Sequence, residues 1–202
     1  MNNSNQGIIA VLLMIPYLMG SGGLTQTFSD GLSAYKANKY KMALEIWRPL
    51  AKKGHVDAQF YLATLYDRGE GVKKNLNEAA RWYKMAAKND DMTAQYNLGW
   101  MYRFGKGVPK NLNKAVDLFK AAAKQGEIAA QSSLGTMYRH GEGLQKNIIL
   151  AHMWMTIAAT QGDYGSKRNL KAIETNMTKT QIQEAQQLAV LCEKKGFTDC
   201  SE

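Results

Sequence analysis

Two side chains have the types and the spacing that nucleophilic catalysis requires. Ser33 and Lys36 lie three residues apart, in the S-x-x-K spacing that lets a lysine activate a serine nucleophile. The S-D-N and K-T-G segments that accompany this motif in such enzymes do not occur in the chain. Because so short a motif recurs by accident, we predict no catalytic residue and expect the protein not to be an enzyme.

The three histidines, His55, His140 and His152, offer no metal-binding pattern. None belongs to an H-E-x-x-H motif or to a pair spaced at i, i+4. The Gly-x-Gly segments, the first at Gly69, follow predicted helices rather than strands, so they do not match a phosphate-binding loop. The sequence predicts neither a metal nor a cofactor, and each histidine is expected to be structural or solvated.

The chain has two cysteines, Cys192 and Cys200, eight residues apart near the C-terminus. In an exported protein such a pair predicts one disulfide that closes a short loop. Two free thiols are the alternative. A zinc site is not expected, because two sulfurs without a nearby histidine supply too few ligands.

The first 23 residues are predicted to be a signal peptide. Residues 8–19 form an apolar run, shorter than a membrane span, and small residues follow at 20–23. An uncleaved anchor is the alternative, since no Lys or Arg precedes the run. We expect a periplasmic or secreted bacterial protein, with no membrane span left after cleavage.

The chain is basic, with 26 Lys and Arg against 17 Asp and Glu and a net charge of +9. Most of the excess lies in residues 24–56 and 93–128, each with 6 basic and 2 acidic groups. These lysines occur singly at exposed helix positions, without basic runs or glycine–aromatic interleaving, so no nucleic-acid partner is expected. A solvated face is the first interpretation, and an acidic partner is the second.

Comparison of the sequence with itself at a shift of 36 residues reveals the elements that would position these side chains. Three units, 57–92, 93–128 and 129–164, then align with eleven identical columns. In the first unit the columns are Ala58, Gln59, Leu62, Tyr66, Gly69, Gly71, Lys74, Asn75, Ala79, Ala86 and Ala87. The apolar columns predict two amphipathic helices per unit and no strands.

The polar and small columns predict how each helix pair is connected. Gly69 and Gly71 permit positive φ angles after the first helix, and Asn75 can cap the second. Position 63 is Ala, and its equivalents are Gly99 and Gly135, which predicts close contact between the two helices.

Residues 24–56 read as a degenerate first repeat, with a first helix at about 30–37 and Pro49 inside the second. The period is lost after residue 164. Residues 165–202 are expected to form a C-terminal cap with a helix at about 179–195, which begins with a Thr178–Gln181 capping box.

The pattern A-Q-x-x-L-G-x-M-Y-x-x-G-x-G-V-x-K-N, followed by A-x-x-x-x-x-x-A-A-K, resembles the Sel1-like repeat, a relative of the tetratricopeptide repeat. It matches best in 93–128. The resemblance implies an all-α, right-handed solenoid with a C-terminal capping helix, and an adaptor that binds proteins. Cysteine-rich members imply β-lactam binding or hydrolysis as the alternative, but they have disulfides inside their repeats and residues 28–164 have no cysteine.

In tetratricopeptide-like solenoids the first helices line the concave groove, and a bound protein or peptide lies across several repeats. The first-helix columns that vary between units predict the partner-binding residues Tyr61, Arg68, Asn97, Trp100, Phe104, Ser133 and His140. Trp100 and Phe104 are large apolar groups that packing does not demand. The alternative is that a neighbouring helix buries Trp100 and that Asn97 is merely solvated.

Overall fold

The computed structural model describes residues 26–198 and 200, so the predicted signal peptide lies outside the described residues. No strand occurs in the described part of the chain, as predicted. Its helices are α1 (Phe28–Lys36), α2 (Tyr40–Lys52), α3 (Val56–Arg68), α4 (Leu76–Ala87), α5 (Met92–Phe104), α6 (Leu112–Lys124), α7 (Ile128–His140), α8 (Ile148–Thr160), α9 (Tyr164–Glu174) and α10 (Lys179–Lys194).

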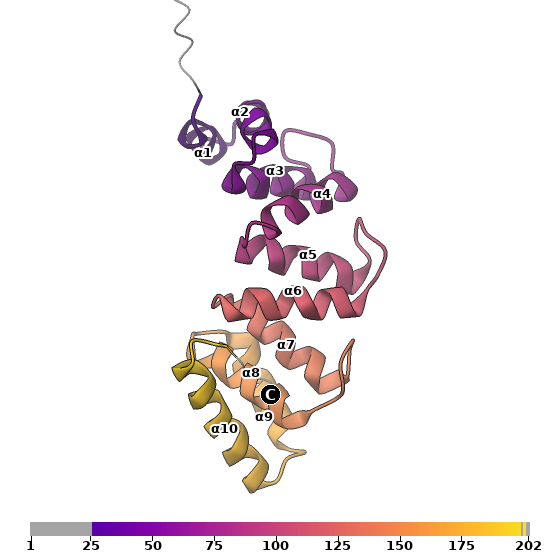
Figure 1. Ribbon diagram of the computed structural model, residues 1–202, viewed down its shortest axis with the longest axis vertical. Coiled ribbons are helices and arrows are strands. Elements are labelled where there is room, and N and C mark those ends of the chain that lie inside the picture. Colours follow the sequence, from indigo (N-terminus) through magenta and orange to yellow (C-terminus); the bar gives the residue numbers. More distant parts are fainter. Residues whose placement is uncertain (1–25, 199, 201–202) are drawn as a thin grey trace, which may run out of the picture.

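The helices stack as successive antiparallel pairs into an elongated solenoid (Figure 1). Helices α3, α5 and α7 begin at residues 56, 92 and 128, which confirms the predicted repeat of 36 residues. From α1 to α9, each helix packs mainly on the helices before and after it in the sequence, as expected when one hairpin cannot bury its apolar faces alone.

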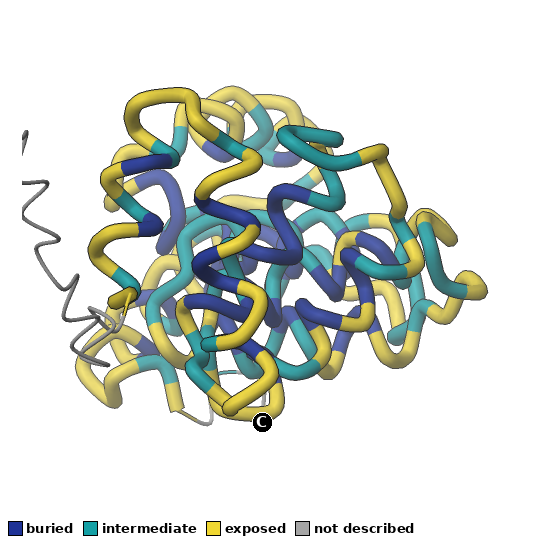
Figure 2. The backbone as a smooth tube through the Cα atoms, turned by 90° about the horizontal axis from the view of Figure 1, so that it is seen from above, coloured by how far each residue is buried: buried dark blue, intermediate teal, exposed yellow. Residues whose placement is uncertain are grey.

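The predicted apolar columns form the core. Leu62, Leu98 and Leu134 are at most 3% exposed, and the inward turns of the helices are buried while the outward turns face solvent (Figure 2). A Cβ atom on Gly99 would lie 2.8 Å from the ring of Phe119, so this glycine allows α5 and α6 to approach each other. The predicted close contact at this column is confirmed.

The connections within each pair follow the predicted design. Gly69 ends α3 with φ 77°, and the Asn75 side chain accepts hydrogen bonds from two backbone N–H groups at the start of α4. The second glycine of each loop also has a tertiary role. A Cβ on Gly107 would overlap the carbonyl of Leu76, so this glycine allows the loop to reach the start of the preceding unit's second helix.

The glutamine column links neighbouring repeats. Each of its buried amides donates to a carbonyl at the end of the preceding unit's second helix: Gln59 to Ala51, Gln95 to Ala87 and Gln131 to Ala123. These carbonyls lie in the last turn of their helices, and each also accepts a hydrogen bond from a backbone N–H group in the turn that follows. A hydrogen bond that spans eight residues, repeated in each unit, therefore joins successive helix pairs.

The first pair, α1 and α2, covers the N-terminal end of the stack. A capping box between Thr27 and Asp30 starts α1 at Phe28, two residues before the predicted start. The indole N–H of the buried Trp47 donates to the Phe28 carbonyl at 3.2 Å, which ties α2 to α1.

The C-terminal end differs from the prediction in one element. Helix α9 begins 36 residues after α7, and its cap Asp163 stands in register with Asp91 and Glu127. The repeat therefore extends beyond residue 164 by one helix. The buried Ile173 of α9 occupies the same packing column as Leu65. The Gly-x-Gly loop that identified the other units in the sequence does not follow α9.

Helix α10 closes the stack by packing on α8 (Figure 1). Its Thr178–Gln181 capping box is confirmed. The predicted disulfide is also confirmed, since Cys192 and Cys200 are bonded and fasten the C-terminal segment to this helix. Among the helices at 28–194, none has both the length and the apolarity required to cross a membrane.

Candidate partner-binding site

Two aromatic rings on α5 remain exposed side by side. Trp100 is 42% exposed and Phe104 is 48% exposed, and their ring centroids lie 4.8 Å apart. The guanidinium of Arg103 lies 5.2 Å from the centroid of the Phe104 ring. Trp100 is thus not covered by a neighbouring helix, and the rings form an apolar surface of the kind that binds partners.

The spacing along α5 explains this exposure. Leu98 and Met101 face the core, so Trp100 and Phe104, one helical turn apart, share a face turned away from the tightest packing. Asp91 caps the helix at its start, and Gly105 ends it in the left-handed conformation. The element that presents the rings is therefore fixed at both ends.

A pocket of about 260 Å³ has Trp100 in its lining and is named here the Trp100 pocket. Its lining combines apolar and polar groups from α3, α4, α5 and the loops that follow α3 and α5: Asp67, Lys74, Leu76, Tyr83, Asn97, Trp100, Met101 and Lys106. Burial raises the pKa of Tyr83 to about 12, so this phenol stays neutral at physiological pH. The Tyr83 hydroxyl is hydrogen-bonded to the Thr64 hydroxyl at 3.3 Å. Asn97 and Trp100, both predicted from sequence, thus line one cavity.

The charged pair in this pocket differs from its equivalent in the next repeat. Arg103 and Glu142, 36 residues after Asp67 and Lys106, form an ion pair with two hydrogen bonds of 2.8 and 3.1 Å. In the described structure no ion pair joins Asp67 to Lys106. These two groups therefore remain available to a ligand.

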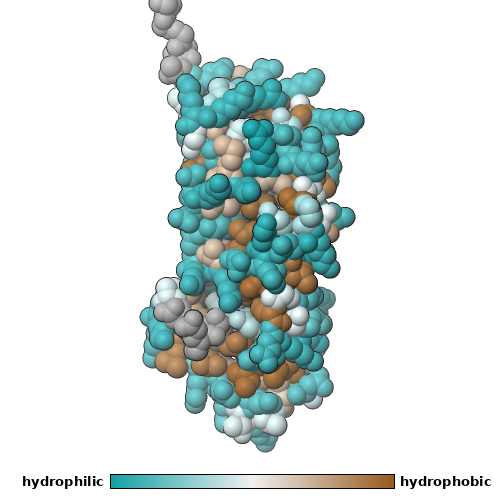
Figure 3. All heavy atoms as spheres, turned by 45° about the vertical axis from the view of Figure 1, so that its right-hand side comes forward, coloured by the Kyte–Doolittle hydropathy of each residue, from teal (hydrophilic) through white to brown (hydrophobic). Residues whose placement is uncertain are grey.

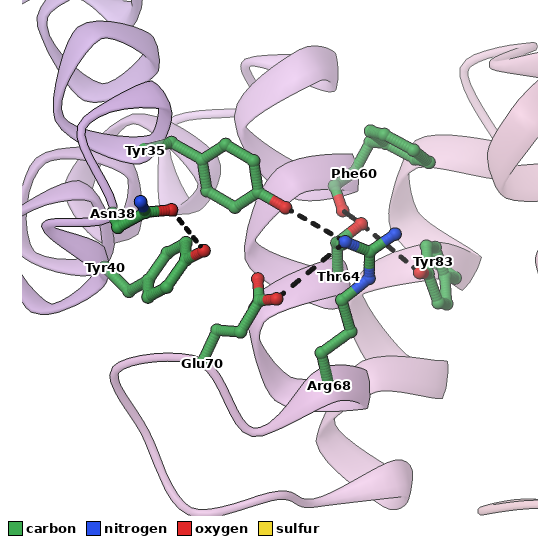
Figure 4. A network of polar contacts seen from close by, with 8 residues as sticks. All are labelled: Tyr35, Asn38, Tyr40, Phe60, Thr64, Arg68, Glu70 and Tyr83. Carbon is green, nitrogen blue, oxygen red and sulfur yellow. Dashed lines mark hydrogen bonds and ion pairs between the residues drawn. The ribbon is translucent and has the colours of Figure 1, made fainter.

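Four of the other predicted residues, Tyr61, Arg68, Ser133 and His140, do not line this pocket. Tyr61 packs in an aromatic cluster, 4.8 Å from the ring centroid of Trp47. Arg68 donates to the Tyr35 hydroxyl at 3.3 Å and approaches Glu70 at 3.8 Å (Figure 4). Both are thus engaged within the first two units.

Ser133 and His140 belong to α7. The Ser133 hydroxyl donates to the Ala129 carbonyl of its own helix, and His140 is exposed in the last turn. Neither makes a hydrogen bond to Trp100 or Phe104 among the described contacts. The structure brings together Asn97, Trp100 and Phe104, and none of the four other predicted residues lines the Trp100 pocket.

Sequence reasoning missed the polar part of the pocket lining, in particular Asp67 and Lys106. The signal for these two residues is that the equivalent positions in the next unit carry opposite charges, Arg103 in place of Asp67 and Glu142 in place of Lys106. It was not usable from sequence alone, because residues 39 positions apart become neighbours only through stacking of the repeats.

The remaining histidines have structural environments. His152 is 1% exposed, with Nε2 2.9 Å from Glu174 and Nδ1 3.2 Å from Thr156, so it holds α9 against α8. His55 caps the start of α3. Within the described range no group of three or more His, Cys, Asp or Glu side chains is placed to hold a metal ion. The hydroxyl of Ser33, the serine of the S-x-x-K segment, donates a hydrogen bond to the Ser29 carbonyl of its own helix.

Comparisons with known proteins agree with this architecture. A Sel1 repeat protein from Oxalobacter formigenes has a similar structure, with a TM-score of 0.70 and 30% identity over 85% of this chain and 78% of that one. The structure of c5321, a protective antigen present in uropathogenic Escherichia coli strains and displaying an SLR fold, gives a TM-score of 0.60 and 28% identity. That match covers 86% of this chain and 46% of c5321.

A curated relative is the exopolysaccharide production negative regulator of Rhizobium meliloti (strain 1021), 40% identical over 60 residues. The aligned part is 30% of this chain and 22% of that protein. The sequence model of the Sel1 repeat matches residues 56–91, 93–127 and 128–163, more than half of the chain. With a helix pair at each of these matches, the chain belongs to the Sel1 repeat family.

Proposed function

We propose that the protein is a non-catalytic scaffold that binds a segment of a partner protein across the first helices, centred on Trp100, Phe104 and Asn97. One observation carries this proposal: two large rings stay exposed side by side next to a pocket. Sel1 repeat proteins are generally protein-interaction scaffolds, which supports the same class of function.

The proposed contacts follow from the chemistry of the pocket. Exposed aromatic rings beside a cavity are typical anchors, because they exchange a large apolar area for contact with the partner. The Asn97 amide can donate to and accept from a peptide backbone. Asp67 and Lys106 line the pocket and can pair with polar groups of the partner, since they have no ion-pair partner in the described structure.

The other predicted residues enter the proposal as flanking contacts. Arg68 and His140 occupy the column of Phe104 in the units before and after, and Tyr61 and Ser133 occupy the column of Asn97. A segment lying along the stack would meet these side chains in turn. We expect them to contribute less than the rings, because Tyr61, Arg68 and Ser133 already have partners inside the protein.

We also propose that the protein acts in the periplasm or outside the cell. The Cys192–Cys200 disulfide supports an oxidising compartment, since such bonds rarely persist in the cytosol. The apolar run and small residues at the start of the sequence support export. The expected partner is then an exported or cell-surface protein.

The test is capture of partners from a periplasmic extract of the host bacterium, with Trp100→Ala and Phe104→Ala combined. We expect captured partner to fall at least about tenfold, because a desolvated aromatic anchor contributes about 2 kcal/mol or more. A second variant, Asp67→Arg with Lys106→Glu, introduces the charge pair of the next repeat and should also weaken capture.

Tyr164→Ala is the matched control, because it removes an aromatic ring that is 83% exposed elsewhere, on α9. It should leave capture unchanged. All variants should retain the wild-type melting temperature. Equal capture by the wild type and the Trp100/Phe104 variant would refute the site, and a large fall in melting temperature would assign Trp100 to the core.

A further inference from the structure

A second pocket lies between the second helices α4 and α6 and is named here the Leu118 pocket. It has a volume of about 280 Å³, and its lining includes Lys84, Lys88, Tyr102, Lys114, Asp117 and Leu118. On α5 it meets Leu98 and Tyr102, whereas the Trp100 pocket meets Asn97, Trp100 and Met101. The two pockets therefore use different sides of that helix.

The Leu118 pocket lies at a packing column in which the middle unit has a different residue from the units on both sides. The equivalents of Leu118 in the flanking units are Trp82 and Trp154, which are 4% and 3% exposed. Leu118 is only half-buried, and its side chain is much smaller than an indole. The middle unit thus lacks the large ring that fills this column in the units on both sides.

The charges around the pocket are also particular to this unit. Lys84, Lys88 and Lys114 are exposed, and no ion pair in the described structure involves them. Asp117 is the acidic group in the lining, so the local charge is positive. The Lys114 ammonium lies 5.3 Å from the ring centroid of Tyr102, which places a cation beside the apolar part of the pocket.

Neighbouring units do not repeat this set of three lysines. The position of Lys114 is Glu78 in the preceding unit and Leu150 in the following one. Lys84 and Lys88 correspond to Lys120 and Lys124, which stand next to the filled column of Trp154. The space and the positive charge coincide at the Leu118 pocket.

We propose that the Leu118 pocket binds an acidic peptide segment of a partner protein, with one bulky apolar side chain inserted between α4 and α6. A volume of about 280 Å³ is below the usual range for a whole small-molecule ligand and suits a single large side chain. Leu98, Tyr102 and Leu118 meet this side chain, and the three lysines meet carboxylates on either side of it. This site is separate from the proposed Trp100 site.

The experiment titrates the ¹⁵N-labelled protein with the synthetic peptide Glu-Glu-Phe-Glu-Glu and follows amide chemical shifts by NMR. We expect shifts concentrated in residues 84–88, 98–102 and 114–118, and an affinity that falls as salt rises. The peptide Glu-Glu-Gly-Glu-Glu, which lacks the apolar side chain, should bind more weakly.

Two variants test the two halves of the site. Leu118→Trp introduces the residue that both flanking units carry, so it should keep the fold and abolish the Phe-dependent gain in affinity. Changing Lys84, Lys88 and Lys114 together to Gln should lower affinity about tenfold, from three partly screened charge contacts. Lys120→Gln with Lys124→Gln is the matched control and should change affinity little.

The Trp100→Ala/Phe104→Ala variant should bind this peptide as the wild type does, which separates this proposal from the function proposed above. Unchanged binding in both Leu118→Trp and the triple lysine variant would overturn the site. Chemical shift changes spread evenly over all basic helices would show general charge attraction without a defined site, and would also overturn the proposal. Equal shifts from sodium benzoate at the same concentration would assign the pocket to a small anion and overturn the peptide proposal.

Discussion

Individual residues decide how well each repeat joins the next, and the buried glutamines show this most directly. In two of the three units the glutamine oxygen also accepts a hydrogen bond, from Gln125 to Gln95 at 2.9 Å and from Gln161 to Gln131 at 2.7 Å. The corresponding oxygen of Gln59 is buried and has no partner. A buried acceptor without a partner lowers the stability of the folded protein.

The missing bond of Gln59 has a cause in the sequence. The residue equivalent to Gln125 is Asn89, which is one methylene shorter, and its amide donates to the Met85 carbonyl instead. We therefore expect Asn89→Gln to raise the free energy of unfolding by about 1 kcal/mol. Chemical denaturation measures this change, and Asn89→Glu is the control, because a carboxylate has no proton to donate and should bring no such gain.

Whole elements are held together across repeats by polar contacts between a helix and the next unit's loop. Arg103 on α5 pairs with Glu142 in the loop between α7 and α8. The hydrogen bonds from Arg103 hold the pKa of Glu142 below its ordinary value of 4.5, against the opposing effect of partial burial. This contact fastens two neighbouring units in a fixed register.

The lowered pKa predicts a pH dependence of stability. A carboxyl whose folded pKa is lowered stabilises the protein above its unfolded pKa, and this contribution is lost as pH falls through the folded value. We expect Glu142→Gln to lower the free energy of unfolding by about 1 kcal/mol at pH 7, the upper range for a partly exposed ion pair. The difference from the wild type should shrink as pH falls below about 4.

Thermal unfolding of both proteins from pH 7 to pH 3 measures this effect. Glu45→Gln is the control, since Glu45 is exposed and forms no ion pair in the described structure. A cost of Glu142→Gln that stayed constant over this range would show that the carboxylate charge does not contribute.

The whole molecule depends on stacking, because contacts between neighbouring helices supply its core. Leu98 is 3% exposed on α5, with a repeat on each side of its unit. We expect Leu98→Ala to destabilise the protein by about 2–5 kcal/mol, from lost burial and the cavity left behind. Helix content followed by circular dichroism should then disappear in one transition at a lower temperature.

Leu191→Ala is the matched control for this prediction, because Leu191 is 52% exposed on α10 and should tolerate truncation with little change. An unchanged melting temperature of Leu98→Ala would mean that the packing columns have been assigned to the wrong face. Two separate transitions would mean that the stack unfolds in parts.

The sequence by itself determined the paired helices of the repeats, their 36-residue period and the glycine and asparagine caps, and it offered the disulfide and the exposed face of α5 as first interpretations. These features depend on spacings of a few residues along one helix or loop, such as Leu98 opposite Trp100, and on repetition that makes the pattern visible. Asn97, Trp100 and Phe104 could be predicted as neighbours for this reason, since all three stand on one helix at helical spacing.

Only the tertiary structure decided which side chains from different repeats meet. The lining of the Trp100 pocket by Lys106, the ion pair of Arg103 and the continuation of the stack in α9 join residues about 30 to 40 positions apart. Likewise, the Leu118 pocket appears only once α4 and α6 lie side by side. Such distances follow from how closely the helices pack, and this depends on side-chain volumes contributed by several elements together.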